Sequence, residues 1–164
     1  MQTAENNCHP NRKNMIYLFR KKIIMLDGFN VRVYAVCLRD GKLLVLHEPF
    51  MGHLVVKLPG GGLEYGEGPA DCLVREFREE LGLEVEVKES FYIQERFVPS
   101  LAKNNKQIVM LYFIADILNP EALEIKDSVI LKADWVPVTE ACPLTLPVDR
   151  QMYEKLKRYV HRQS

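Results

Sequence analysis

Residues 61–83 read GGLEYGEGPADCLVREFREELGL, and this stretch decides the fold because a glycine turn leads directly into a bounded helix. Pro69 suits the first helical position, where its missing N–H costs nothing, and Gly82 is a typical helix end. Five apolar side chains recur between them with helical periodicity and predict the face that packs on the core. They are Ala70, Leu73, Val74, Phe77 and Leu81.

The same helix carries three carboxylates, Glu76, Glu79 and Glu80, at spacings that bring them together on its surface. Unpaired they would repel one another, and hard divalent cations are the natural ligands for such oxygens. Arg75 lies one turn before Glu79 and can orient a carboxylate through a bidentate pair. Three glutamates alone would favour a solvated acidic face. The preceding glycines at 60–62 favour a metal site instead, since their backbone can approach a ligand closely.

Two cations held by these acids could bind a diphosphate and activate a water for in-line attack at phosphorus. The whole pattern resembles the signature of the Nudix hydrolase family. That signature is Gly, five residues, Glu, seven residues, Arg-Glu, a bulky apolar residue, any residue, Glu-Glu, any residue, Gly, and a bulky apolar residue. All its specified positions match here, from Gly61 and Glu67 through Arg75-Glu76 and Glu79-Glu80 to Gly82-Leu83.

The resemblance implies an α/β/α sandwich with a mixed sheet. It implies an Mg²⁺- or Mn²⁺-dependent hydrolase that cleaves the diphosphate linkage of a nucleoside diphosphate joined to another group and releases a nucleoside monophosphate. By position, Glu76, Glu79 and Glu80 resemble the metal ligands, and the backbone carbonyl of Gly60 would join them. Arg75 would orient these acids during catalysis.

Further roles follow from the same resemblance. Gly61, Gly62 and Glu67 would lie against the substrate, and Glu67 would also support the loop or bind metal through water. Glu79 or Glu80 would take the proton from the attacking water. Some relatives use an acid on a distant loop for this step, and the candidates here are Glu121, Glu124 and Asp127.

Composition limits the remaining possibilities. The chain has 164 residues and a formal net charge of zero, which argues against a nucleic-acid binder that relies on bulk positive charge. We expect one domain over 15–164 behind a flexible tail over 1–14. The polar N-terminus lacks the apolar run of a signal peptide, and no stretch approaches transmembrane length. We therefore expect a cytoplasmic protein with reduced thiols and no membrane partner.

The rest of the chain reads as several strands, the helix, several strands and a last helix, which predicts a single α/β domain. Asp40-Gly41 predicts a hairpin, and Pro147 predicts the start of the last helix. The expected strands lie at 31–38, 54–58, 84–97, 108–117 and 129–138, with loops at 99–106 and 119–128. A further candidate strand, Ile23–Leu26, could pair with a second copy, so we expect a homodimer.

Two other functions stay open: a non-catalytic module that senses nucleotides on the same fold, and an isomerase that uses diphosphates. Aromatic side chains that could stack on a base are more often buried in a core. They are Phe50, Tyr65, Tyr92 and Phe97. Arg32, Lys57 and Arg96 could reach a phosphate, although such charges are usually solvated.

Overall fold

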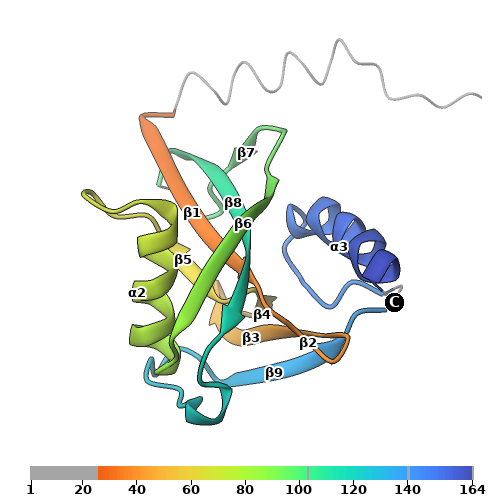
Figure 1. The fold of residues 1–164 in the computed structure, drawn as a ribbon. Helices are drawn as coiled ribbons and strands as arrows, with labels where there is room; N and C mark the ends of the chain where they lie inside the picture. Colours follow the sequence, from red (N-terminus) through yellow and green to blue (C-terminus); the bar gives the residue numbers. More distant parts are fainter. Residues whose placement is uncertain (1–25, 103, 140, 164) are drawn as a thin grey trace, which may run out of the picture.

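The computed structural model describes residues 26–102, 104–139 and 141–163, and its strands lie between two α-helices (Figure 1). One mixed sheet has the order β5 (Gly60–Gly62), β1 (Gly28–Val36), β8 (Lys106–Ile117) and β6 (Val85–Ile93), and β7 (Val98–Pro99) also pairs with β8. β1 and β8 run parallel and the other pairs are antiparallel. The mixed sheet predicted from the motif is therefore confirmed.

A second, antiparallel sheet lies below the first in Figure 1. Its central strand β3 (Lys42–Phe50) pairs with β2 (Leu38–Arg39), β4 (His53–Lys57) and β9 (Lys132–Pro137). The predicted hairpin at Asp40-Gly41 joins β2 to β3. Both of its residues have positive φ, 50° and 69°, as a two-residue hairpin turn requires.

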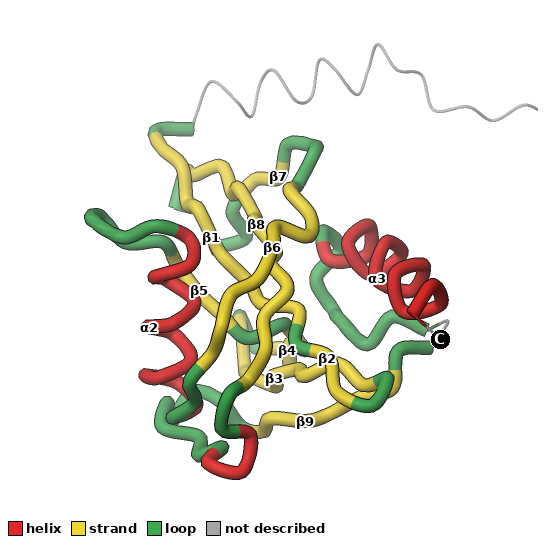
Figure 2. The backbone as a smooth tube through the Cα atoms, viewed as in Figure 1, coloured by secondary structure: helices red, strands yellow, loops and turns green. Residues whose placement is uncertain are grey.

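The helices α2 (Pro69–Leu81) and α3 (Asp149–Gln163) cover opposite faces of the mixed sheet (Figure 2). β1 supplies both cores because its side chains alternate between faces. Val33 and Ala35 lie in the core with α2, whereas Tyr34 and Val36 lie in the core with α3. This arrangement confirms the α/β/α sandwich.

Some expected bounds were wrong. The last helix begins at Asp149, because the two residues from Pro147 form a turn in which Asp149 N donates to Leu146 O at 3.0 Å. The strand expected over 84–97 is interrupted by register shifts around Ser90 and ends at Ile93. Ala70, expected in the core, is exposed in the first turn of α2. The tail at 1–14 and residues 23–25 of the candidate dimer strand lie outside the described residues, so the homodimer stays a prediction.

Asp149 anchors α3 to the sheet from a buried position with only 2% of its surface exposed. Its Oδ1 accepts a hydrogen bond of 2.6 Å from Tyr112 Oη on β8. Burial raises the pKa of Asp149 from 3.8 to about 6, although the bond from Tyr112 lowers it. The folded protein therefore holds this proton more tightly than the unfolded chain, so the raised pKa costs stability above pH 6 and the cost disappears as pH falls towards 4.

We expect Asp149→Asn to raise the free energy of unfolding at pH 7.5 by about 1–3 kcal/mol, because the amide oxygen still accepts the Tyr112 bond without a buried charge. Loss of a favourable charge in the first turn of α3 offsets part of this gain. Urea unfolding of the wild type and of Asp149→Asn at pH 7.5 and pH 4.5 measures this difference in the free energy of unfolding. Equal stability differences at the two pH values would contradict the assignment.

Candidate active site

Helix α2 is held by caps at both ends, which fixes the direction of its acidic side. At the start, Asp71 Oδ2 accepts a 2.9 Å hydrogen bond from Gly68 N. At the end, Gly82 adopts a left-handed conformation with φ 64°, and Leu83 N donates to Phe77 O at 3.1 Å. Burial of Cys72, Leu73, Phe77 and Leu81 fixes which side of α2 faces the core.

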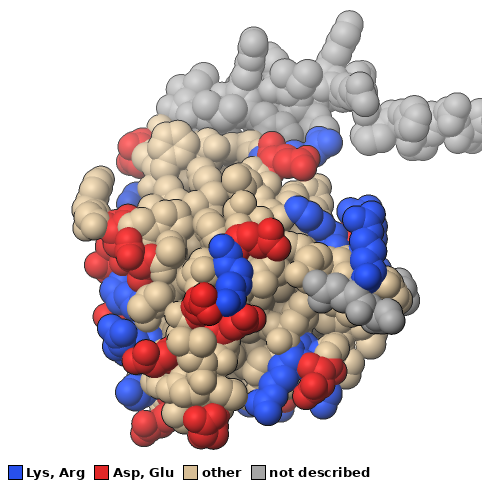
Figure 3. Space-filling view, in the orientation of Figure 1, with Lys and Arg blue, Asp and Glu red and all other residues tan. Residues whose placement is uncertain are grey.

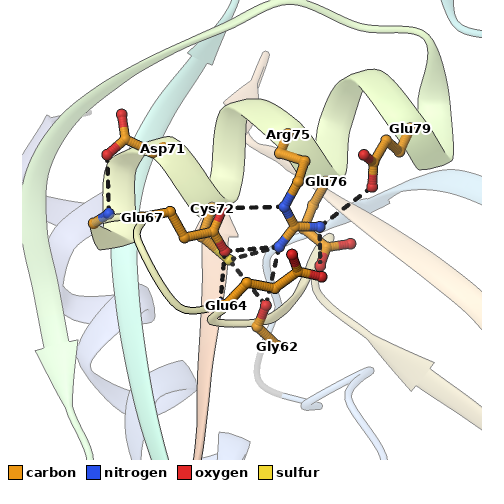
Figure 4. Close-up of polar contacts among 9 residues, drawn as sticks. Gly62, Glu64, Glu67, Asp71, Cys72, Arg75, Glu76 and Glu79 are labelled. Carbon is orange, nitrogen blue, oxygen red and sulfur yellow. Dashed lines mark hydrogen bonds and ion pairs between the residues drawn. The ribbon is translucent and has the colours of Figure 1, made fainter.

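Arg75 lies at the centre of a network that joins the helix to the loop before it (Figure 4). Its bidentate partner is Glu67 in the loop rather than Glu79, with bonds of 3.0 Å from Nε and 2.8 Å from Nη2. Nη1 donates to Glu76 at 3.1 Å and to Glu79 at 3.2 Å, and Nη2 also donates to Gly62 O at 3.0 Å. One guanidinium therefore orients three acids and one backbone carbonyl.

Glu67 closes the loop as well as binding Arg75. Its Oε1 accepts a 2.8 Å hydrogen bond from Glu64 N. The bond from Arg75 and the backbone bond together hold the pKa of Glu67 down at about 2. These contacts support the structural role expected for Glu67, and a contact with substrate stays a prediction.

The glycines at 60–62 were predicted to form a turn, but they form the short strand β5, which pairs with β1. Two close approaches require glycine in this strand. A Cβ on Gly60 would lie 2.2 Å from Val33 O, and the φ of Gly60 is +125°. A Cβ on Gly61 would lie 2.2 Å from Oε1 of Glu76. The carboxylate of Glu76 thus lies directly against the backbone of β5, and only glycine at position 61 permits this contact.

Glu80 projects to the inner side of α2, where its Oε2 is buried and has no hydrogen-bond partner in the described part of the chain. Burial raises the pKa of Glu80 to about 7. The charge of Lys57 lowers this pKa, whereas the charge of Glu76 raises it further. Lys57 on β4 is itself 5% exposed and forms an ion pair of 2.8 Å with Glu48 Oε2. Burial lowers the pKa of Lys57, but the carboxylates of Glu80 and Glu48 more than offset this and raise it.

The segment after β8 docks on the C-terminal end of α2. Glu124 N donates to Leu81 O at 3.0 Å, and Lys126 N donates to Glu80 O at 2.8 Å. The Lys126 side chain passes so close to Gly82 that a Cβ there would lie 2.9 Å from its Cε. This segment therefore satisfies carbonyl groups that the last turn of a helix leaves without partners.

The three candidate loop acids differ in burial. Glu121 and Glu124 are exposed. Asp127 is half-buried, and its charge contributes to the raised pKa of Glu80. Its Oδ1 accepts a 2.9 Å hydrogen bond from Val129 N, which shapes the loop. The identity of the general base stays a prediction, with Asp127 the loop acid whose charge acts on the helix acids.

A cavity of about 270 Å³ opens beside this acidic edge. Arg32 and Lys57 line it, and both connect it to the acids: Arg32 pairs in register with Gly62, and the charge of Lys57 acts on Glu80. Apolar residues from the sheets, the 98–102 loop and the segment before α3 form most of the wall. They include Phe50, Val55, Val98, Pro99, Leu101, Ile108, Met110, Leu146 and Val148.

The sequence did not reveal which charged and aromatic residues belong to this cavity. Lys57 was expected to be solvated but is buried, and no local signal distinguishes it from an ordinary strand lysine. Arg96 is exposed, as expected. Tyr65 was expected in the core but is fully exposed at the loop tip, whereas Tyr92 packs on Tyr112 at 5.8 Å between ring centroids.

The residues present fit a hard divalent cation, although the described carboxylates do not converge on one point. Their donor set consists of oxygen atoms alone, as Mg²⁺ and Mn²⁺ prefer. Glu79 is 62% exposed along its side chain and is held by a single contact to Arg75, so it is free to turn. The buried Oε2 of Glu80 has no partner among the described residues, and a bound cation would satisfy it.

Comparison with known proteins agrees with this fold. The model of the NUDIX domain matches residues 28–158. Human diphosphoinositol polyphosphate phosphohydrolase 3-beta is 28% identical over 138 residues, which cover 80% of each chain.

Solved structures share the arrangement of elements. The solution structure of the E. coli ORF135 protein superposes with a TM-score of 0.66 at 26% identity and covers 82% of this chain and 93% of its own. A NUDIX hydrolase from Nitrosomonas europaea superposes with a TM-score of 0.65 at 25% identity. The match covers 79% of this chain and 89% of that protein's chain.

Two surface features bear on possible partners. Acidic and basic side chains are interspersed over the face shown in Figure 3, as the zero net charge suggests. In the described part of the chain, no helix combines the length and the apolar character needed to cross a membrane.

Proposed function

Because this chain belongs to the Nudix hydrolase family, we propose that it cleaves the diphosphate linkage of a nucleoside diphosphate joined to another group, with Mg²⁺ or Mn²⁺. The products would be a nucleoside monophosphate and the phosphate of the other group. One observation carries the proposal. Glu76 extends from α2, the helix that also bears Glu79 and Glu80, and its carboxylate lies against the glycines of β5.

In this proposal Glu76, Glu79, Glu80 and the carbonyl of Gly60 hold the cation. A bound divalent cation would neutralise the diphosphate and lower the pKa of a water for attack at phosphorus. Arg75 holds Glu76 and Glu79 in position through its two contacts. Glu79 or Glu80 would accept the proton of that water. Gly62 leaves room for a phosphate beside β5, and Gly61 leaves room for the carboxylate of Glu76.

The lining of the cavity supports one orientation of the substrate in this proposal. Arg32 and Lys57 line the side of the cavity that is linked to the acids, and most of its other lining residues are apolar. A flat, largely apolar group such as a nucleobase fits this wall, because ligand pockets of a few hundred Å³ bind mainly through apolar contact. The diphosphate would then extend past Arg32 towards α2.

The substrate named for the human relative suits this cavity less well. A diphosphoinositol polyphosphate carries phosphates around its whole ring. Apolar side chains such as Val55, Ile108 and Met110 would face those phosphates, and the carboxylate of Glu48 would repel them. Desolvating phosphate groups against such a wall is costly.

The test is a screen of nucleoside triphosphates, dinucleoside polyphosphates, nucleotide sugars, ADP-ribose and a diphosphoinositol polyphosphate, each with and without Mg²⁺. We expect Mg²⁺-dependent release of a nucleoside monophosphate from at least one nucleotide. For that substrate, Glu79→Gln with Glu80→Gln should lower kcat/KM by about 10²–10⁴, as expected when groups that hold the cation and move the proton are lost.

Glu86→Gln on β6, an exposed carboxylate, is the matched control and should leave turnover within about twofold of the wild type. Activity of the double variant within a few-fold of the wild type would refute the assignment. Nucleotide binding without turnover across the panel would favour the sensing module. Consumption of a diphosphate without release of phosphate or nucleoside monophosphate would favour the isomerase.

A further inference from the structure

Lys57 and Glu48 form a buried ion pair in the wall of the cavity. Their side chains are 7% and 18% exposed, and Lys57 Nζ lies 2.8 Å from Glu48 Oε2. β3 and β4 place them on one face of the hairpin, because Glu48 pairs in register with Val55 and Lys57 follows two residues later. Both side chains therefore project into the space that Val55, Ile108 and Met110 otherwise line with apolar groups.

Stability does not explain this pair. Removing two charges from water costs more than their attraction usually returns, and well-packed apolar replacements are often as stable or more stable. The position is also already crowded with charge, since the charge of Glu80 acts on Lys57 from α2 and the charge of Glu48 acts on Arg32, which also lines the cavity. In contrast, a few polar groups in an apolar pocket commonly fix the orientation of a ligand and select among ligands.

We propose that Lys57 and Glu48 are specificity-determining residues that read the hydrogen-bonding edge of a nucleobase bound in the cavity. The inference rests on the proposed function and extends it by naming the part of the substrate that these residues contact. The ammonium group of Lys57 has three N–H donors, of which the contact with Glu48 uses one. The carboxylate of Glu48 has its second oxygen, Oε1, as an acceptor.

The pair thus presents a donor beside an acceptor at one wall of an apolar space. A base edge with a ring nitrogen or carbonyl next to an N–H group is complementary to it. A hydrocarbon group would leave both charged groups unsatisfied, and a phosphorylated ring would place negative charge against Glu48. A site that binds a ligand through buried polar groups rejects analogues that lack the matching groups, because those polar groups then stay unpaired.

Binding without metal tests the inference independently of turnover. Calorimetric titrations in EDTA would use AMP, GMP, CMP, UMP and, as a probe without a base, ribose 5-phosphate. We expect at least one nucleoside monophosphate to bind tenfold or more tightly than ribose 5-phosphate. We also expect the four nucleotides to differ among themselves by tenfold or more.

The decisive variant replaces both members of the pair, Lys57→Met with Glu48→Met, because Lys57→Met alone leaves a buried carboxylate unpaired and can unfold the protein. We expect the double variant to keep its Tm within a few degrees of the wild type and to bind all four nucleotides within about threefold of one another. The matched control is Lys132→Met with Asp134→Asn. It removes an ion pair of 2.5 Å on β9 that does not line the cavity, and it should preserve the wild-type order.

Glu48→Gln gives a second, independent measurement, since the amide can donate where the carboxylate only accepted. It should change the order of the four nucleotides and raise KM for the preferred substrate, with kcat changed by less than about threefold. A double variant or a Glu48→Gln protein with the wild-type order and spread would overturn the inference, and so would a wild type that binds ribose 5-phosphate as tightly as every nucleotide. If selective binding is lost in the double variant but no substrate is hydrolysed, the inference holds and the proposed function fails.

Discussion

Gly61→Ala should lower kcat/KM by about 100-fold or more and leave the fold almost unchanged. The added Cβ would lie 2.2 Å from Oε1 of Glu76, so the carboxylate must turn away from β5. This displacement is easy for the fold, because the clashing atom is the end of a flexible side chain. It is severe for the chemistry, because misplacing a reacting group by about 1 Å can cost about 10²-fold.

The adjacent glycines provide matched controls for this change. In Gly60→Ala the Cβ would lie 2.2 Å from the backbone Val33 O at a φ of +125°, so the sheet itself must move. We expect a loss of about 3 kcal/mol or more in the free energy of unfolding, seen as a Tm lower by about 6–12 °C. In Gly62→Ala the Cβ meets open space and does not displace Glu76, so Tm should stay close to that of the wild type and activity should fall by less than about tenfold.

Thermal unfolding and steady-state kinetics of the three variants measure both effects. The pattern would be a lower Tm at Gly60, inactivity in a folded protein at Gly61, and a small loss of activity in a folded protein at Gly62. Full activity in a folded Gly61→Ala protein would show that the position of Glu76 against β5 is not needed for hydrolysis.

Arg75→Gln is the second change with a large expected effect. It removes the contacts that hold Glu67, Glu76, Glu79 and the carbonyl of Gly62 together. The remaining carboxylates then repel one another across the site. We expect kcat/KM to fall by about 10²–10³, because the acids lose their common orientation, and Tm to fall as well.

Arg75→Lys distinguishes geometry from charge. Lysine keeps the positive charge but cannot form the bidentate pair with Glu67, so most of the activity should still be lost. Arg78→Gln on the exposed side of α2 is the control, since Arg78 only approaches Glu84 at 4.0 Å and should be dispensable. An Arg75→Lys protein with wild-type kcat/KM would show that the charge alone suffices.

The sequence predicted those parts of the fold that local chemistry determines. Helix α2 lies between Pro69 and Gly82 because each residue suits its end of a helix, and the apolar period within it is strong. The turn at Asp40-Gly41 was equally clear, since few residue pairs accept two positive φ angles in succession. The motif also predicted the layered architecture through its resemblance to a known family, a step that periodicity alone could not supply.

The parts that escaped prediction depend on contacts between distant segments. Lys57 is buried because β3 brings Glu48 beside it across a hairpin, and neither residue differs from a surface charge when read alone. Arg75 forms its bidentate pair with Glu67 and not with Glu79, because the loop before α2 brings Glu67 beside the helix. The spacing of the residues does not reveal this path. The cavity to which we assign the substrate falls in this second group, because loops and strands far apart in sequence line it.

The hydrogen bonds from Glu124 and Lys126 to the last turn of α2 have a practical consequence for redesign. A chimaera that exchanges residues 118–123 for the corresponding stretch of another enzyme would alter the connection after β8 and leave the acid-bearing helix α2 in place. A graft that also replaces 124–127 would remove the support of that helix, and Gly82 would lose the lysine side chain that fits against it. The natural junction for exchanging parts therefore lies just before Glu124.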